Sequence, residues 1–310
     1  MSIHSSSDCC WCRSSSGDLL QPTGETSRRR PSRRQSLPHG EPARPKRPRR
    51  RIRIRKPSIP GHADGRSLIT MTYRYPHFHA RLLAEDMRFQ AGPRPGEDMP
   101  DFDLPTVDGG RVTKSDFAGR TPLLLTIGSV TCPMTAAADP ALKRLHSEFG
   151  EHVAFMTLYV REAHPGDRYP QPDGFERKME HARDLKERDE LPWPVAVDDL
   201  DGTLHRHLDP KPNAAYLMDA DGRVFFRVLW SDDRETILRT ALENVLSGGS
   251  QPREHQGHVV PMLRGVAEMD RMLTLSGPTA RRDVRKAAPP MYAMARVMGL
   301  MKHRRGHVPA

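Results

Sequence analysis

Hydrophobic positions change between strand and helix spacing several times after residue 99. Residues 122–128, PLLLTIG, form an unbroken apolar run of strand length, which is typical of a buried central strand. Residues 134–149 then place apolar side chains at helical spacing, and Pro140 within them predicts a kink or a late helix start. This order predicts a strand that leads directly into a helix through the short turn GSVTCP.

Further segments of both kinds surround this pair. One hairpin is predicted around the turn Asp108-Gly109-Gly110, and a second around the turn at 219–222. The remaining predicted elements are strands at 152–160, 194–197, 214–218 and 224–229, and helices at 173–189, from Asp232 or Asp233 to Val245, and around 259–274. Strands that alternate with helices and then end in a hairpin predict an α/β fold with a central mixed sheet covered on both faces.

Charge divides the chain into three parts, although its formal net charge is +10 overall. Residues 1–70 hold 16 Lys or Arg and 5 Asp or Glu among many Ser and Pro, which we interpret as a disordered basic tail with too little apolar surface to bury. Residues 71–249 are acidic and form the predicted folded domain, and residues 250–310 form a basic, Met-rich extension, partly helical. Nucleic acid is expected as a partner only through the basic tail.

Globular composition begins at Met71, so an alternative hypothesis is that translation starts there and that residues 1–70 are not translated. Mass spectrometry of the native N-terminus distinguishes the two hypotheses. A peptide that spans Thr70 and Met71 would exclude the later start.

Cysteine is sparse in the predicted domain. Cys132 is the only cysteine after the tail, which carries Cys9, Cys10 and Cys12. One thiol cannot form an internal disulfide, which excludes a disulfide-stapled secreted framework for the domain. The first residues lack the order of a signal peptide, and no apolar stretch reaches the about 18 residues of a membrane span. We therefore expect a cytoplasmic protein without a membrane partner.

Two motifs carry a resemblance to a known family. GSVTCP at 128–133 and YVREAHPGD at 159–167 are similar to the iodothyronine deiodinases, in which a Gly-Ser-x-Thr-selenocysteine-Pro turn is followed by a Glu-Ala-His strand end. The segment PGEDMPDFDLPTVDGGRVTKSDFAGR resembles the N-terminal hairpin of the redoxin and peroxiredoxin branch of the thioredoxin-like superfamily. The resemblance covers roughly residues 95–247. It implies a thioredoxin-like three-layer sandwich with a central mixed sheet, an N-terminal β-hairpin and helices on both faces.

The resemblance implies a role for each matching position. Cys132 stands at the selenocysteine position, and Glu162 and His164 match the family's acidic residue and proton-handling histidine. The positions that match the turn around the nucleophile are Ser129, Thr131 and Pro133.

Three departures from the family pattern limit what the resemblance implies. Cysteine replaces selenium, which implies a weaker nucleophile, and Val130 stands where the family often has a cysteine. The arginine expected shortly before the late strand is not evident in PNAAYLMD. The resemblance therefore does not by itself assign iodothyronine as the substrate.

The residues around Cys132 also favour a reactive thiol on physical grounds. A free cysteine has a pKa of about 8.5, and the unpaired N–H groups and positive potential of a helix N-terminus favour the thiolate. Pro133 suits the first helical position, and the hydroxyls of Thr131 and Thr135 can donate to the sulfur. The alternative is an inert core thiol, because free cysteine packs like a small hydrophobic residue.

Glu162 and His164 alternate with Ala163 at the predicted strand end, so their side chains are expected on one face. A carboxylate beside an imidazole raises the pKa of the imidazole and orients it, which suits a proton donor near neutral pH. The alternative is a solvated strand end with an ordinary histidine.

Other candidates carry weaker signals. Pro212 lies near the position of the cis-proline that thioredoxin-like folds place against the active cysteine, and a turn proline explains it equally well. Ser129 fits either a pocket hydroxyl or a strand end, Trp193 fits packing, and His181 fits a solvated helix surface. No metal site is expected, because the pairs His77/His79 and His205/His207 lack a Cys or carboxylate partner at ligand spacing, and CCWC in the tail lacks a second ligand pair.

Three functions compete. The first is a thiol-dependent reductive enzyme of deiodinase type, in which Cys132 attacks a small soft electrophile, His164 supplies a proton and Glu162 assists it. No tightly bound cofactor is expected, and an external thiol such as thioredoxin or glutathione must regenerate Cys132, because the domain has no second cysteine.

The second function is a one-cysteine peroxidase of peroxiredoxin or glutathione peroxidase type, in which peroxide converts Cys132 to a sulfenic acid. Leu125 and Ser129 stand where a peroxiredoxin has Pro and Thr, so only the hydroxyl is kept. The third is a non-catalytic thioredoxin-fold scaffold with basic arms. The sequence names neither the substrate nor the oligomeric state.

Overall fold

The structure, a computed structural model, describes residues 73–231, 235–250 and 259–305. The predicted disordered tail, Met71 and the predicted capping residues Asp232 and Asp233 lie outside the described residues.

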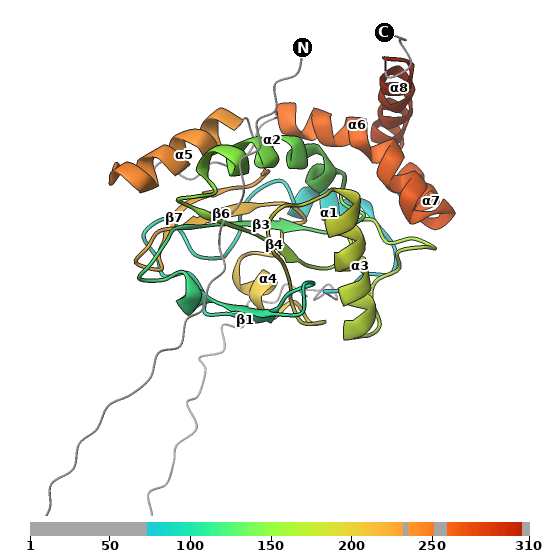
Figure 1. Cartoon of the computed structure of the whole chain (residues 1–310). Helices are drawn as coiled ribbons and strands as arrows, with labels where there is room; N and C mark the ends of the chain where they lie inside the picture. The colour runs from blue at the N-terminus through green and yellow to red at the C-terminus, as the bar shows by residue number, and fades with distance from the viewer. Residues whose placement is uncertain (1–72, 232–234, 251–258, 306–310) are drawn as a thin grey trace, which may run out of the picture. The chain divides into compact units, whose positions relative to one another are not determined.

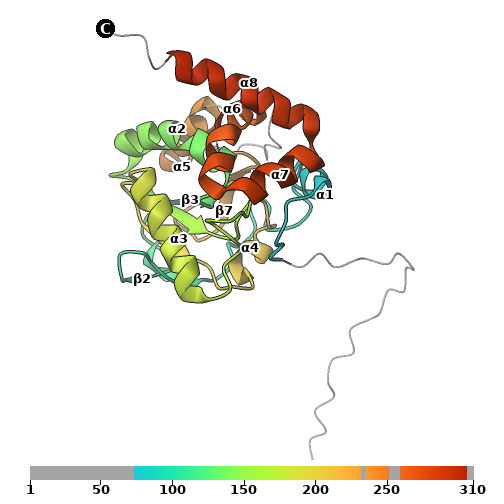
Figure 2. The same ribbon diagram turned by 90° about the vertical axis from the view of Figure 1, so that its right-hand side faces the viewer.

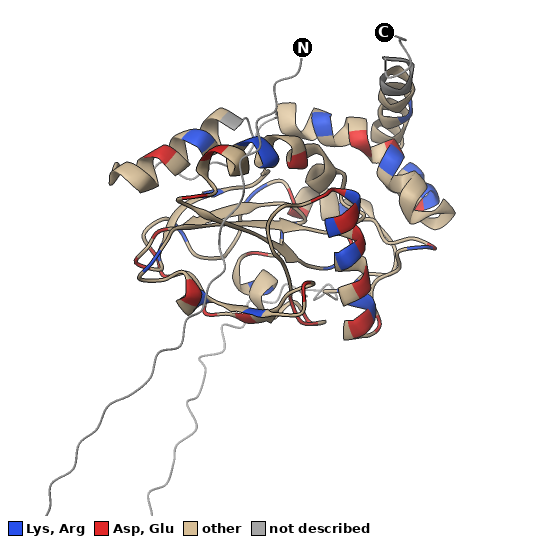
Figure 3. Ribbon diagram, viewed as in Figure 1, with Lys and Arg blue, Asp and Glu red and all other residues tan. Residues whose placement is uncertain are grey.

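A five-stranded sheet in the order β5-β4-β3-β6-β7 forms the centre of the described chain (Figure 1). Its strands are β3 (Leu123–Gly128), β4 (Ala154–Tyr159), β5 (Val195–Val197), β6 (Ala215–Met218) and β7 (Val224–Val228). β3 pairs parallel to β4 and β4 parallel to β5, whereas β6 runs antiparallel to both β3 and β7. All six residues of β3 are buried, as the uninterrupted apolar run requires. Figure 3 shows charged residues spread along the helices and nearly absent from β3 and β4.

One face of the sheet packs against three helices and the other against a hairpin and a short helix. The helices on the first face are α2 (Pro133–Phe149), α3 (Phe175–Arg188) and α5 (Glu235–Ser247), whose apolar residues share one core cluster. The second face is covered by the antiparallel hairpin of β1 (Asp103–Pro105) and β2 (Arg111–Thr113), with the 3-10 turn η1 (Lys114–Asp116) after it, and by α4 (Thr203–His207). Apolar side chains therefore fill both sides of the sheet.

This topology is thioredoxin-like and confirms the predicted fold class. A parallel β-α-β-α-β half is followed by an antiparallel hairpin and a last helix, with layers on both sides of the sheet. Two details differ from the sequence prediction. Helix α2 runs from Pro133 through Pro140 to Phe149, so it does not start late at Pro140. Strand β4 ends at Tyr159, so residues 162–164 do not continue the strand whose alternation we expect them to share.

The C-terminal extension is helical and packs against the rest of the chain. It comprises α6 (Val259–Ser276), α7 (Pro278–Ala287) and α8 (Pro289–Arg305), so the predicted helix around 259–274 is confirmed and two more follow it. Helix α6 lies along α2, and Figure 2 shows α7 and α8 near the N-terminal helix α1 (Ala80–Glu85). A third core cluster joins these elements through Phe78, Leu82, Val266 and Val284. Among the described helices, none is both long and apolar enough to cross a membrane.

Candidate functional site

Cys132 occupies the N-cap of helix α2, with Pro133 at the start of the helix. Its backbone N–H donates to the Ser129 carbonyl oxygen at 3.1 Å, and its own carbonyl oxygen accepts the Ala136 N–H at 3.2 Å. A β-strand followed at once by a proline-initiated helix therefore places the sulfur at the helix N-terminus, as the sequence predicts. The cysteine is only 1% exposed.

Burial raises the pKa of the Cys132 thiol above its ordinary value. The Thr135 hydroxyl and the backbone N–H groups of Thr135 and Met134 oppose this effect, because each favours the thiolate. Thr135 Oγ1 is buried and makes no regular hydrogen bond among the described residues, so its hydroxyl is free to turn toward the sulfur. The expected stabilisation by the helix terminus is present, but desolvation exceeds it.

A cavity of about 80 Å³ adjoins the sulfur. Its lining comprises Tyr75, Phe78, Leu83, Asp86, Met87, Cys132, Pro133, Met134, Ala163, His164, Pro212, Trp230, Met262, Gly265, Val266, Met269 and Met291. Most of these side chains are apolar, and Cys132, His164 and Asp86 are titratable groups among them. The cavity therefore brings together two of the predicted catalytic residues, Cys132 and His164, and adds the carboxyl group of Asp86.

His164 is buried at the cavity, with its ring centroid 4.5 Å from that of Phe78. Its Nδ1 atom is buried without a hydrogen-bond partner in the described chain. Burial lowers the pKa of His164 to about 4, so the ring is neutral at pH 7. The predicted raising of this pKa by a neighbouring carboxylate is wrong.

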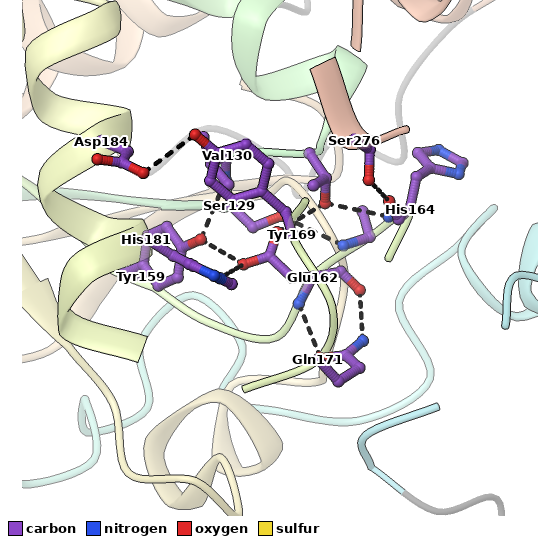
Figure 4. Close-up of polar contacts among 12 residues, drawn as sticks. Ser129, Val130, Tyr159, Glu162, His164, Tyr169, Gln171, His181, Asp184 and Ser276 are labelled. Atoms are coloured by element: carbon purple, nitrogen blue, oxygen red, sulfur yellow. Dashed lines mark hydrogen bonds and ion pairs between the residues drawn. The ribbon is translucent and has the colours of Figure 1, made fainter. Parts of the chain in front are cut away.

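Glu162 lies on the other side of this loop, in a buried polar cluster that Figure 4 shows. Its carboxylate accepts hydrogen bonds from the Thr131 hydroxyl at 2.7 Å and from the Tyr159 hydroxyl, and His181 Nδ1 lies 3.1 Å from Oε1. The predicted pairing of Glu162 with the His164 ring is wrong. Strand β4 ends before the Glu-Ala-His segment, so the alternation of a strand does not place the two side chains on one face.

Thr131 connects the two loops that carry Cys132 and His164. Besides donating to Glu162, its hydroxyl oxygen accepts the backbone N–H of His164 at 3.2 Å. The Thr131 hydroxyl therefore donates to the Glu162 carboxylate and not, as the sequence predicts for it, to the Cys132 sulfur. That prediction is wrong. Glu162 and Thr131 hold the loops in place, whereas Thr135 faces the sulfur.

The remaining predicted residues separate into cavity and scaffold positions. Pro212 lines the cavity with Cys132, which agrees with a proline packed near the active cysteine. Ser129 is buried and its Oγ accepts the backbone N–H of Ala163 at 3.3 Å, so it joins the same two loops and does not line the cavity. Trp193 is buried and donates from Nε1 to the Thr157 hydroxyl at 2.8 Å, which confirms packing.

Several residues of the site were not predicted. The sequence favours a solvated surface for His181, yet the residue is 3% exposed and its Nδ1 contacts Glu162. A signal existed, because His181 shares the i, i+4 spacing with Leu185 on the buried side of α3. The sequence carries no signal for Asp86, because nothing local in it indicates that the segment after α1 returns to Cys132. Burial raises the pKa of Asp86 to about 7, against the opposing effect of Arg161 and Lys211.

The histidine pairs make contacts of other kinds. His77 Nδ1 lies 2.8 Å from Asp283 Oδ2, and His205 Nδ1 lies 2.7 Å from the Tyr73 hydroxyl. No group of three or more His, Cys, Asp or Glu residues in the described ranges is arranged to hold a metal ion.

The fold and the buried cysteine at a helix N-terminus thus define a thioredoxin-like protein with a single-cysteine site. Residues 48–192 match the family model described as iodothyronine deiodinase. This range contains Cys132, Glu162, His164 and His181, and it begins before Met71 and ends earlier than the range of our resemblance. The resemblance to the iodothyronine deiodinases is confirmed.

Individual relatives agree. A thyroxine 5-deiodinase from Gallus gallus is 31% identical over 116 residues, which cover 34% of this chain and 45% of that protein. A type II iodothyronine deiodinase from Sus scrofa is 38% identical over 68 residues, covering 22% of this chain and 25% of that protein. The chain therefore spans less than half the length of these relatives.

Solved structures with partial likeness include two bacterial proteins. A putative thiol:disulfide interchange protein DsbE from Chlorobium tepidum has a TM-score of 0.40 and 18% identity, covering 50% of this chain and 99% of that chain. An uncharacterized conserved protein from Geobacillus kaustophilus has a TM-score of 0.44 and 20% identity, covering 54% of this chain and 88% of that chain.

Proposed function

We propose that this protein is a thiol-dependent oxidoreductase of deiodinase type, which uses Cys132 to reduce a small electrophile. The observation that carries the proposal is the cavity lined by Cys132, by Asp86 and by His164, whose buried Nδ1 atom has no hydrogen-bond partner among the described residues. An inert core thiol would need neither a cavity nor groups that exchange protons.

The reaction we propose is a reductive dehalogenation. The Cys132 thiolate attacks the halogen of an organic halide, so that a sulfur–halogen bond forms and the carbon–halogen bond breaks. The carbon takes up a proton. Two external thiols then reduce the sulfur–halogen bond, which restores Cys132 and releases a disulfide and a hydrogen halide. Glutathione or thioredoxin-type thiols fit the reductant, because Cys132 is the only cysteine of the domain.

The charge states of the three cavity groups indicate which of them supplies the proton that the carbon takes up. Cys132 holds its proton at neutral pH because burial raises the pKa of the thiol, and Asp86 has a pKa of about 7. Asp86 is thus the group best matched to take the thiol proton and return it to the product. His164 is neutral at pH 7, so it acts through hydrogen bonds of its imidazole to the reacting atoms.

A one-cysteine peroxidase is the second candidate, and the size of the cavity favours it. About 80 Å³ next to the sulfur suits a molecule as small as a hydroperoxide. The thiolate would take the terminal oxygen, forming a sulfenic acid and releasing an alcohol, and two external thiols would reduce the sulfenic acid to the thiol and water.

Turnover with an external thiol tests the proposal. The full chain is assayed with halogenated aromatics, small organohalides and hydroperoxides, beside its Cys132→Ser, His164→Ala and Cys12→Ser variants. We expect Cys132→Ser to abolish turnover, His164→Ala to reduce it strongly, and Cys12→Ser to leave it unchanged. Halide release without peroxide turnover supports the dehalogenase, and the reverse supports the peroxidase. Absence of both activities leaves the non-catalytic scaffold, and full activity of His164→Ala refutes its role.

A further inference from the structure

Two segments outside the sheet and its covering helices enclose the Cys132 sulfur. Tyr75, Phe78 and Met87 come from the N-terminal segment, and Met262 and Met269 come from helix α6, which belongs to the C-terminal extension. The extension therefore forms one wall of the site.

Specific hydrogen bonds attach the extension to the loop that follows His164. The Ser276 hydroxyl donates to the His164 carbonyl oxygen at 2.7 Å, and the Ser276 carbonyl oxygen accepts the Arg168 N–H at 2.9 Å. At the start of α7, the backbone N–H and the hydroxyl of Thr279 donate to Asp167 at 2.7 and 2.8 Å. These contacts fix the end of α6 and the start of α7 against the residues that carry His164.

Helix α6 also lies very close to helix α2 beside the sulfur. A Cβ atom added at Gly265 would overlap Met134 Sδ, and both residues line the cavity. The absence of a side chain at Gly265 therefore lets α6 approach α2 closely enough to close the cavity on this side.

The space beside the sulfur is small and largely apolar. An engineered cavity of about 150 Å³ holds one benzene molecule, whereas the cavity at Cys132 measures about 80 Å³. A charged ligand would lose its hydration in this lining, and desolvating a charge without a paired partner is unfavourable. The Asp86 carboxyl group disfavours an anion further.

We propose that residues 73–87 and helix α6 form a selective pocket over Cys132, which admits small uncharged electrophiles with fewer atoms than a benzene ring and excludes anions and two-ring molecules. The proposal rests on the proposed function only in taking the bound molecule to be the substrate. Access to the sulfur can be measured without any turnover.

Alkylation of the full chain by three iodo reagents tests this selection. In each case the Cys132 thiolate displaces iodide from a CH₂ carbon and forms a thioether. The reagents are iodoacetamide, which is small and neutral, iodoacetate, which is small and anionic, and a fluorescein-linked iodoacetamide, which is bulky. Peptide mass spectrometry reports modification at Cys132 apart from the tail cysteines, and each rate is divided by the rate of the same reagent with the urea-unfolded chain.

We expect the normalised rates of iodoacetate and of the bulky reagent to be at least about tenfold below that of iodoacetamide. The bulky reagent adds atoms that the pocket does not fit, and iodoacetate must lose the hydration of its charge. Met262 is half-buried and lines the cavity, so Met262→Ala removes side-chain volume from its wall. The variant should raise the rate of the bulky reagent several-fold relative to that of iodoacetamide. Met269→Ala is a second variant of the same wall. Leu263→Ala is the matched control, because Leu263 is 38% exposed on the same helix and does not line the cavity.

Equal normalised rates for all three reagents would overturn the proposal of a selective pocket. An unchanged rate of the bulky reagent in both Met variants would overturn it too, provided that circular dichroism shows the variants to be folded. Selective alkylation without turnover of any substrate would instead refute the proposed function and leave the pocket standing.

Discussion

Thr131 donates a hydrogen bond to Glu162 Oε2 at 2.7 Å, and its hydroxyl oxygen accepts the backbone N–H of His164. One side chain thus joins the residue before Cys132 to the loop that carries His164. The carboxylate that anchors it is fully buried and has further partners in Tyr159 and His181. A buried carboxylate is stable only with such partners, so this cluster fixes the relative position of the two cavity groups.

We expect Glu162→Gln to destabilise the protein by about 1–3 kcal/mol, because the amide places a donor where the cluster supplies donors. Thermal and urea denaturation measure this change. The normalised alkylation rate of Cys132 should change as well, since the loop that presents it is released. Glu180→Gln, at an exposed position of α3, is the matched control and should alter neither quantity. Wild-type stability of Glu162→Gln would show that the cluster does not hold the loops.

The part of the site that could be predicted lies within one stretch of sequence. The apolar run of β3, Pro133 and the periodic residues of α2 act locally, so the sequence alone indicates that Cys132 lies between a strand and a helix. The arrangement of Glu162 and His164 depends on where β4 ends, and strand ends are the least certain feature of a sequence pattern. His181 is buried because Glu162, from another segment, needs a partner.

The cavity wall could not be predicted for a related reason. Residues 73–87 and α6 are nearly two hundred positions apart, and each looks like an ordinary amphipathic segment. Only their mutual packing through residues such as Phe78 and Val266 places them over Cys132. No local sequence pattern indicates a contact between two segments so far apart along the chain.

The pKa of Cys132 gives a second prediction. Since burial raises it, the alkylation rate by iodoacetamide should keep rising with pH beyond about 8.5, the value of a free cysteine. Thr135→Val removes a hydroxyl that favours the thiolate and should slow alkylation at pH 8 by about two- to fivefold, as expected for the loss of about 0.5–1 kcal/mol.

Thr240→Val, on the exposed side of α5, is the control for Thr135→Val and should match the wild type. An apparent pKa well below about 8.5 would contradict the prediction. It would show that the helix N-terminus outweighs desolvation at this sulfur.

A third prediction concerns stability at low pH. Burial holds His164 neutral, with a pKa of about 4 against the usual 6.5. Between these pH values the unfolded chain binds a proton that the folded chain does not, so this group lowers the free energy of unfolding as the pH falls from 6.5 to 4, and its full stability is present above 6.5. The loss amounts to about 3 kcal/mol.

Urea denaturation of the wild type and of His164→Gln at pH 7 and pH 4 isolates this contribution. Asp86 and His205 titrate in both proteins, so their effects cancel in the difference. The wild type should lose about 3 kcal/mol more than the variant between the two pH values. His152→Gln, at an exposed position, should follow the wild type. Equal losses in wild type and His164→Gln would mean that the ring gains its proton in the folded state without cost.

The close approach of helices α6 and α2 gives the last prediction. In an ordinary helix interior Gly→Ala stabilises by about 1 kcal/mol, but at Gly265 the new Cβ must displace the Met134 side chain, which lines the cavity. We expect Gly265→Ala to destabilise by about 1–3 kcal/mol, as overpacking does, and to change the alkylation rate of Cys132. Met134→Ala added to Gly265→Ala removes the overlap and should recover most of the stability lost to it. A double-mutant cycle by urea denaturation measures the coupling, and additive effects of the two substitutions would show that α6 does not press on α2 beside the sulfur.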